Sequence, residues 1–287
     1  YIEKPLIEII ADMESNGIKV KKDNLLQLSE NFSKQLAKLQ DKIFLCSSSE
    51  FNINSTKQLG EIIFDKLKIP GAKKNKSGSF STNSEVLETL AEQGYEIASL
   101  VLSWREISKL KNTYTESLTN NISNKTNRVH TTIQMTGAQT GRFSSTDPNL
   151  QNIPIKSKNG KEIRKAFVSE KGYKLVCFDY SQIELRLLAE IAKIEELRKA
   201  FNQGLDIHKL TASQIFNVEV SKVNNDQRRN AKAINFGIIY GLSAFGLSKQ
   251  LNISRTEAKN YIEAYFLKYP GIQLYMEKMK AYVSEHG

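Results

Sequence analysis

The chain has 287 residues, enough for two or three compact units with a sizeable hydrophobic core. Its formal net charge of +10 favours a polyanionic partner, although charge alone leaves ribosomal, membrane-surface and nucleic-acid-binding proteins open. No apolar run approaches the roughly 18 residues of a membrane span. The only two cysteines, Cys46 and Cys177, are too few and too distant for a disulfide framework or a zinc site, which favours a reducing compartment.

Apolar residues at helical spacing dominate the N-terminal part of the chain, where no motif with chemistry occurs. We expect a helix over residues 2–16 that ends at Gly17, then further helices joined by polar loops, and a long helix that reaches Tyr114. The residues expected to cap the helices after the first are Asp23, Ser55 and Thr82, the last in a T-x-x-E capping box with Glu85.

A basic loop rich in Gly and Ser, residues 71–80, lies between these helices and carries Lys73, Lys74 and Lys76. Such a loop is usually a solvated connection. The functional alternative is contact with the phosphates of a nucleic-acid strand.

A second polar loop, residues 136–154, follows an alternating stretch, residues 129–135, that predicts a strand. We interpret His130 in that strand as a cross-strand or surface residue rather than a ligand. Arg, Asn and Gln side chains can read the acceptors of a minor groove, and the alternative is a turn-rich connection without that role. The candidate side chains in this loop are Arg142, Asn149, Gln151 and Asn152.

Residues 174–192 combine a short apolar strand, Leu175 to Phe178, with a carboxylate, Asp179, at its end. A carboxylate at the mouth of a strand is well placed to hold a metal ion. Ser181 and Glu184 form an S-x-x-E capping box for a helix that runs on through Ile191. Glu184 therefore has a structural explanation as well as a possible functional one.

The last third of the chain is expected to be helical. Asp206 can cap a helix whose first turn holds His208, ordinarily a surface position. Later helices begin at Ser254, in a capping box with Glu257, and at Pro270.

The helix expected after Asn225 or Asp226, either of which can act as its cap, carries the most informative pattern. Spacing by four residues places a stripe roughly 18 Å long on one side, two cations followed by two aromatic rings. That order suits an elongated ligand with phosphates at one end and a flat base at the other. The alternative is a solvated basic surface. The stripe is Arg228, Lys232, Phe236 and Tyr240; the expected core side is Ala231, Ile234, Ile238 and Phe245; Gly237 and Gly241 are expected where something approaches the backbone.

Four strings resemble motifs of family A DNA polymerases of the bacterial DNA polymerase I type: R-x-x-x-K-x-x-x-F-G-x-x-Y-G, TGRFSSTDPNLQNIP, DYSQIELR and D-x-H-x-x-T-A. The resemblance spans the whole chain, with Phe143 where Leu is usual. It implies an α+β right-hand fold with a helical thumb, an antiparallel-sheet palm and helical fingers. The implied divisions are a helix leading into the palm over residues 1–24, thumb 25–115, palm 116–192 with the first catalytic motif, and fingers 193–287.

The resemblance also implies the reaction, template-directed addition of dNTPs to a primer 3′ end during replication and repair, with two Mg²⁺ ions. Asp179 and the Tyr180 carbonyl match the metal ligands, and Glu184, held by Tyr240, matches a gate that excludes a 2′-hydroxyl. The implied catalytic residues are Asp179, Glu184, Arg228 and Lys232. The implied nucleotide-binding residues are Tyr180, Ser181, Gln182, Glu184, His208, Arg228, Lys232, Phe236 and Tyr240. The implied DNA-binding residues are Arg142, Asn149, Gln151, Asn152, Lys73, Lys74 and Lys76.

One departure from the family is the His-Asp-Glu motif, which does not occur downstream of Gly241. Because the chain also starts with Tyr1, we expect the natural protein to continue, with the second metal-binding carboxylate beyond residue 287. A protein of these residues alone is then expected not to extend a primer. We expect a monomer that binds primer–template DNA and dNTPs, no membrane, and the bacterial cytoplasm with the nucleoid, while an organelle origin stays open. The alternatives are a single-subunit RNA polymerase relative and a non-catalytic DNA-binding module.

Overall fold

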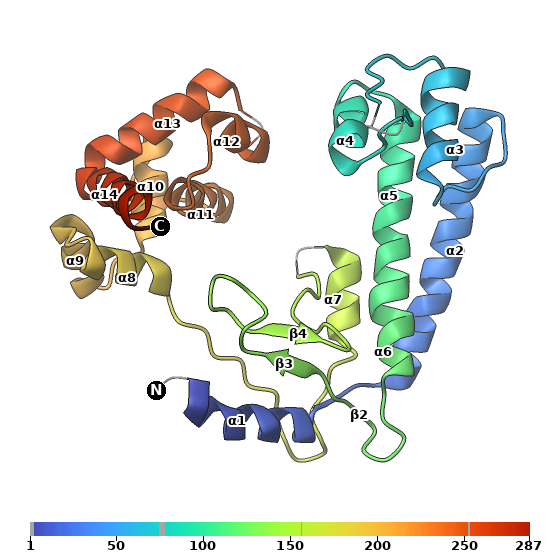
Figure 1. Cartoon of the computed structure of the whole chain (residues 1–287), viewed down its shortest axis with the longest axis horizontal. Helices are drawn as coiled ribbons and strands as arrows, with labels where there is room; N and C mark the ends of the chain where they lie inside the picture. The colour runs from blue at the N-terminus through green and yellow to red at the C-terminus, as the bar shows by residue number, and fades with distance from the viewer. Residues whose placement is uncertain (1–2, 75–77, 156, 252) are drawn as a thin grey trace. The chain divides into compact units, whose positions relative to one another are not determined.

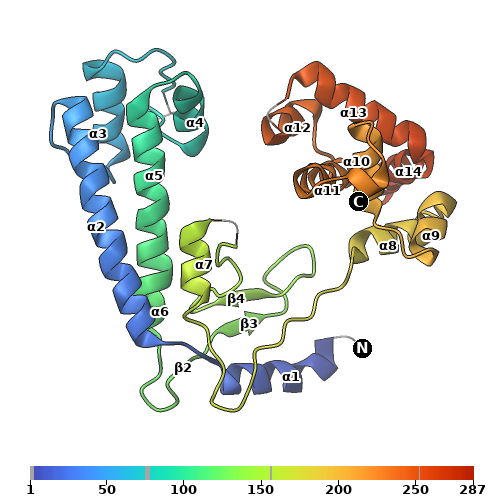
Figure 2. The same ribbon diagram turned by 180° about the vertical axis from the view of Figure 1, so that it is seen from behind.

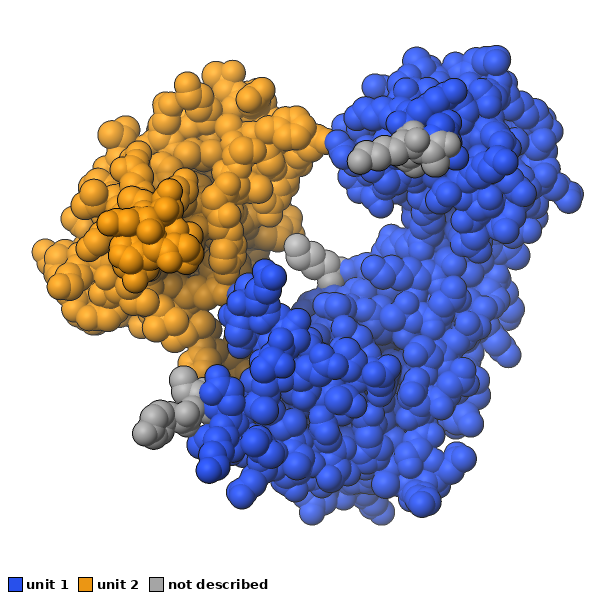
Figure 3. Space-filling model, in the orientation of Figure 1, with its two compact units in different colours: residues 1–176 blue, residues 177–287 orange. Residues whose placement is uncertain are grey.

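The computed structural model describes residues 3–74, 78–155, 157–251 and 253–287. The chain divides into two compact units, residues 1–176 and residues 177–287 (Figure 3). Lys76 lies outside the described residues. Among the helices that the structure describes, none has the length and apolar character needed to cross a membrane.

Unit 1 is built on two long helices, α2 and α5, which lie side by side in both views (Figures 1 and 2). One core joins the C-terminal part of α2 and the N-terminal part of α5 to α3, η1 and α4, around Ile63, Leu87 and Val101. A second core joins the N-terminal part of α2 and the C-terminal end of α5 to α7, around Phe32, Leu110 and Ile163. The helices of unit 1 are α1 (Glu3–Asn16), α2 (Lys22–Ser47), α3 (Thr56–Gly60), η1 (Glu61–Lys66), α4 (Ser84–Glu92), α5 (Glu96–Leu110), η2 (Lys111–Glu116), α6 (Ser117–Asn120) and α7 (Lys158–Arg164).

Short antiparallel pairs supply the strands of unit 1. β1 (Ile18–Lys19) pairs with β2 (Arg128–Val129), and β3 (Thr132–Gln134) pairs with β4 (Ser144–Thr146). The continuous strand predicted over residues 129–135 is therefore wrong, because it is interrupted between β2 and β3. There the ring of His130 bonds to the Glu14 carbonyl and the hydroxyl of Thr131 donates to the Pro148 carbonyl.

Unit 2 is helical and has a large core formed by residues such as Leu185, Leu197, Ile234, Ile238 and Ile272. Its helices are α8 (Ile183–Ile191), α9 (Glu195–Asn202), α10 (Ile207–Ile215), η3 (Val220–Lys222), α11 (Asn225–Ile239), α12 (Ala244–Leu251), α13 (Arg255–Lys268) and α14 (Pro270–His286). The predicted helix starts at Ser254 and Pro270 are confirmed, since Ser254 accepts from the Glu257 N–H and Pro270 is the first residue of α14.

Some of the other predicted helix ends are confirmed, and some are wrong. The end of α1 before Gly17 and the caps Ser55 and Asp206 are confirmed. Asp23 lies inside α2, whose N-cap is Lys21 and has no side-chain hydrogen bond. The cap of α4 is Asn83 instead of Thr82. Thr82 is buried, and its carbonyl and its hydroxyl both accept hydrogen bonds from the guanidinium of Arg105.

Candidate nucleotide-binding site

Helix α11 is set up by its sequence. Its cap is Asn224, one residue before Asn225 and two before Asp226, the two predicted caps, in a full capping box with Gln227. The Asn224 side chain accepts from the Gln227 N–H at 2.8 Å, and the Asn224 N–H donates to the Gln227 side chain at 3.1 Å. Because Ile234 and Ile238 are buried in the core of unit 2, the opposite side of α11 is left for the stripe.

The side chains of the stripe follow one another along α11. The ammonium of Lys232 lies 5.8 Å from the centroid of the Phe236 ring. The Phe236 and Tyr240 rings stack with centroids 6.2 Å apart. Phe245, predicted on the core side, is instead 53% exposed and belongs to α12, because α11 ends before it.

Different features of the backbone explain the two glycines of the motif, Gly237 and Gly241. A Cβ on Gly237 would meet the side chain of Leu242 at 2.8 Å, so a close approach does occur there. Gly241 has nothing within 4 Å of an added Cβ, but its φ is +76°, in the left-handed region that suits glycine just after a helix. No described protein atom therefore approaches the backbone at Gly241, and the approach of a ligand there stays a prediction.

Arg228 forms an ion pair at the start of the stripe. Its Nε donates to Oδ2 of Asp206 at 2.7 Å, while Oδ1 of Asp206 caps α10 by accepting from the N–H groups of His208 and Lys209. Burial by itself raises the pKa of Asp206, but the hydrogen bonds from Arg228 and the Lys209 N–H outweigh it, and the net pKa is lowered. Arg228 is thus held in place by a carboxylate that also starts the neighbouring helix.

His208 is not the surface residue that its place in a first turn would ordinarily make it. It is 1% exposed, and its ring centroid lies 5.6 Å from that of Phe236. Nδ1 of His208 is 2.9 Å from the amide nitrogen of Asn235. Burial lowers the pKa of His208 to about 4, opposed by Asp206 and reinforced by Arg228 and Lys232, so the imidazole is neutral at pH 7.

Sequence reasoning missed Asn235, which is fully buried on the core side of α11. Its side-chain oxygen accepts from the hydroxyl of Thr211 at 3.1 Å. A signal did exist, because a polar residue between Ile234 and Ile238 breaks the apolar side of an amphipathic helix and must find a partner.

The segment that carries Asp179 has none of the predicted local structure. Residues 174–180 are exposed and form no strand, so the strand predicted from Leu175 to Phe178 is wrong. The predicted Ser181 capping box is also wrong, because the N-cap of α8 is Gln182, with φ 53° and no side-chain cap. Gln182 accepts from the Ile207 N–H at 3.2 Å, which ties the start of α8 to the start of α10.

Around this segment, Tyr180 is 80% exposed, and Glu184 lies half-buried in the first turn of α8. Nε of Arg186 donates to the Ser181 carbonyl at 2.9 Å. Asp179 is exposed, and within the part of the chain that the structure describes no three His, Cys, Asp or Glu side chains gather as a metal-binding group.

The predicted DNA-binding side chains of unit 1 lie on loops. Lys73, Lys74 and Arg142 are exposed. Asn149 accepts from the N–H groups of Gln151 and Asn152, and Gln151 accepts from Ser145 N–H and donates to the Phe143 carbonyl. Asn149 and Asn152 also line a cavity of about 420 Å³ beside Tyr114 and Lys109. The side-chain amides of Asn149 and Gln151 therefore shape their own loop.

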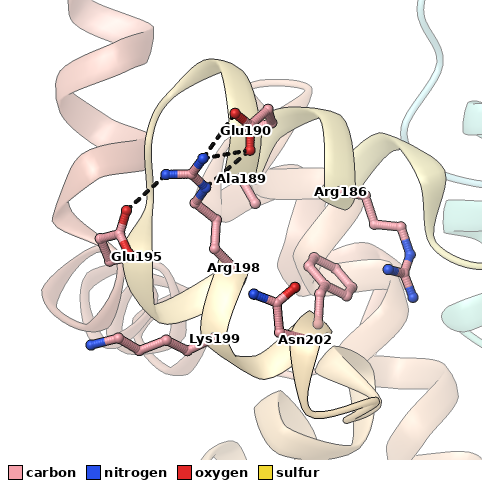
Figure 4. Close-up of a pocket in the computed structure, with 8 residues that line it drawn as sticks. Arg186, Ala189, Glu190, Glu195, Arg198, Lys199 and Asn202 are labelled. Atoms are coloured by element: carbon pink, nitrogen blue, oxygen red, sulfur yellow. Dashed lines mark hydrogen bonds and ion pairs between the residues drawn. The ribbon is translucent and has the colours of Figure 1, made fainter.

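A separate cavity of about 400 Å³ in unit 2 contains none of the predicted site residues (Figure 4). Arg198 points toward Glu190 and Glu195 and pairs with both at 2.8 Å. The guanidinium of Arg186 lies 4.5 Å from the centroid of the Phe201 ring. Because the charges within these exposed ion pairs neutralise one another, we assign no ligand to the cavity.

Comparisons with known proteins place the chain in a family. Residues 22–287 match the model of DNA polymerase family A. The chain is 48% identical to DNA polymerase I of Rhizobium leguminosarum, a match that covers all of this chain and 28% of the relative. It is 47% identical to DNA polymerase I of Pseudomonas aeruginosa, covering 31% of that protein. The chain thus spans about a third of the length of the curated relatives it matches.

A solved structure agrees in fold. The POL domain of Pol1 from M. smegmatis, in complex with DNA primer-template and dNTP, superposes with a TM-score of 0.88 at 38% identity, covering 99% of this chain and 50% of that one. The match confirms the predicted α+β polymerase fold, rich in helix with few antiparallel strands. The chain belongs to DNA polymerase family A.

Proposed function

We propose that this protein catalyses template-directed DNA synthesis, adding deoxynucleotides from dNTPs to the 3′ end of a primer. The observation that carries the proposal is the stripe on α11, where Arg228 and Lys232 precede the stacked rings of Phe236 and Tyr240. The relatives support it, because they are DNA polymerases I, and so does the solved domain complexed with primer-template and dNTP. Their bacterial sources favour a cytoplasmic protein that acts at the nucleoid.

The order of groups along the stripe suits a nucleoside triphosphate. Arg228 and Lys232 neutralise the phosphates, and a guanidinium can donate two hydrogen bonds to one phosphate group. Phe236 and Tyr240 present flat faces to the sugar and base. At the start of α8, Tyr180, Ser181, Gln182 and Glu184 complete the nucleotide site.

Mg²⁺ is proposed at Asp179, with the Tyr180 carbonyl as a second ligand, because Mg²⁺ takes carboxylate and carbonyl oxygens. Asp179 fits one side of a metal site; a single carboxylate does not hold two dications that repel each other. When bound, the metal supplies positive charge near the attacking and leaving oxygens. The residues of this chain hold the nucleotide and neutralise its phosphates.

Contacts with the DNA duplex are proposed for unit 1. The long helices α2 and α5 belong to the proposed thumb, residues 25–115. Residues 1–24 are proposed to lead into the palm, residues 116–192, and the fingers are residues 193–287. Exposed Lys73, Lys74 and Arg142 supply positive charge for the phosphates and minor groove. Asn149, Gln151 and Asn152 form the loop that presents Arg142.

The experiment that tests the function is primer extension by the complete protein with Lys232→Ala. We expect the KM for dNTP to rise by about 10- to 100-fold, the equivalent of one charge-assisted contact, with duplex affinity unchanged. The matched control is Arg229→Ala, a cation on the same helix whose guanidinium pairs at 3.0 Å with Asp226 on the surface. Weakened duplex binding with a normal KM for Lys232→Ala would place the stripe on the DNA instead.

The sugar preference distinguishes a DNA polymerase from an RNA polymerase relative. A pocket that rejects one hydroxyl by fit alone reaches only about 10² in discrimination, so a gate must add a clash or an unpaired group. We expect Glu184→Ala to incorporate ribonucleotides far more readily than the parent. Unchanged selectivity would remove Glu184 from the gate.

A further inference from the structure

The buried amide of Asn235 connects α11 to α10 through two hydrogen bonds. Its oxygen accepts from the Thr211 hydroxyl at 3.1 Å, and its nitrogen lies 2.9 Å from Nδ1 of His208. All three side chains are buried, with 0% of Asn235, 3% of Thr211 and 1% of His208 exposed. A buried polar group without a partner is costly, so each atom in this chain of contacts is committed to its neighbour.

The direction of these bonds determines the tautomer of His208. The Thr211 hydroxyl needs an acceptor, and among the described residues its hydrogen bond goes to the oxygen of Asn235. That bond orients the amide so that its NH₂ group faces His208. An amide NH₂ only donates, so Nδ1 accepts and carries no proton. A neutral imidazole then bears its single proton on Nε2.

We propose that Asn235 is a positioning residue that fixes His208 as its Nε2–H tautomer, so that the ring meets a bound nucleotide as a neutral hydrogen-bond donor. The inference rests on the proposed function. The charges of Asp206, Arg228 and Lys232 act on the His208 ring, and its centroid lies 5.6 Å from that of Phe236 in the stripe.

A neutral donor is what this location favours. Arg228 and Lys232 would repel an imidazolium and Asp206 would attract it, so the burial of the ring decides the balance. The pKa of His208, lowered to about 4 chiefly by burial, keeps the ring uncharged. Because the ring is 1% exposed, its tautomer is set by Asn235 before a nucleotide arrives.

The test is Asn235→Asp, which keeps the size of the side chain but replaces the donor by a carboxylate that only accepts. Nδ1 must then carry a proton. In ¹⁵N-histidine-labelled protein we expect the His208 Nδ1 resonance to be pyridine-type in the parent and pyrrole-type in Asn235→Asp, with His208→Gln identifying the signal. Where the ring stays neutral and Nε2 has lost its proton, which a pyridine-type Nε2 resonance reports, the KM for dNTP should rise about 10- to 100-fold, the loss of one hydrogen bond to a charged acceptor.

Further variants separate positioning from folding. In a His208→Gln background, Asn235→Asp should change KM by less than about twofold, because neighbours that act together are non-additive. Thr211→Val removes the hydroxyl that orients the amide, and it replaces Asn235→Asp as the test if that variant does not fold. The His208 Nδ1 resonance of Thr211→Val should gain pyrrole-type character.

Two results would overturn the proposal: a pyrrole-type Nδ1 in the parent, or a KM for dNTP that is unchanged in Asn235→Asp although Nε2 has become pyridine-type. Failure of the proposed function is distinguishable, because a parent protein that does not extend primers leaves the tautomer readable by the resonances alone.

Discussion

Helix α11 and residues 173–182, which contain the start of the DYSQIELR string, both carry residues that identify the family in sequence, yet only α11 forms regular structure of its own. α11 is capped by Asn224 and packs Ile234 and Ile238 into the core. The segment around Asp179 pairs with no strand among the described residues, and Phe178 is 92% exposed. A helix satisfies its backbone within itself, whereas a strand needs a neighbouring strand to bond with.

The comparison teaches what a motif can specify. In α11 the spacing of the residues fixes which side chains share a side, because the helix itself sets the geometry. Along residues 173–182 the motif indicates what Asp179 can do chemically. It does not specify which other segments surround Asp179. The predictions below test whether function and stability really divide between these two stretches.

The largest expected effect is a loss of catalysis when Asp179 is replaced, in the segment that forms no helix or strand of its own. Asp179→Asn should lower kcat by about 10³-fold or more, because charge stabilisation worth several kcal/mol is lost. Its thermal midpoint should stay close to that of the parent, since Asp179 is exposed. The control is Asp226→Asn, an exposed carboxylate in the first turn of α11 that should keep normal kcat.

Stability should respond in the opposite way to truncation of apolar side chains. Ile234→Ala, at 0% exposure, should lower the free energy of unfolding by about 2–5 kcal/mol. Val176→Ala, at 69% exposure, should change it by less than about 0.5 kcal/mol. Urea unfolding measures both, and equal costs would show that residues 173–182 are packed in solution.

The buried histidine behind α11 should make stability depend on pH. The pKa of His208 falls from its ordinary 6.5 to about 4 on folding, so between these values the unfolded chain binds a proton that the folded chain does not. Stability from this group is complete above about pH 6.5 and is lost as the pH falls toward about 4. The loss is of order 1–3 kcal/mol.

His208→Gln provides the comparison, because Gln does not titrate. Urea midpoints measured from pH 7 to pH 4 should fall more steeply for the parent than for His208→Gln. Parallel curves would mean that the imidazole becomes protonated without opening the structure.

The smallest expected effect separates a true cap from an apparent one. Asn224→Ala should cost about 1 kcal/mol of unfolding free energy, since the Asn224 side chain accepts from the Gln227 N–H. Ser181→Ala should cost less than about 0.5 kcal/mol, because Ser181 makes no side-chain cap on α8. A cost for Ser181→Ala equal to that for Asn224→Ala would restore the capping box that the sequence predicts.

The sequence by itself determined features that depend on near neighbours along the chain. The stripe of α11, the caps Ser55, Asp206 and Ser254, and the start of α14 at Pro270 all follow from contacts within a turn or two. Where polar residues stand side by side, as at Thr82 and Asn83, the pattern located the helix start only to within a residue, because either side chain can cap.

The tertiary structure alone decided which of these side chains became buried and paired. His208 and Asn235 are 27 positions apart in the chain, and their hydrogen bond exists only because α10 packs against α11. The pairing of Arg228 with Asp206 has the same origin. Burial and tautomer depend on what surrounds an atom in space, and spacing along one helix does not specify the helix that packs on it.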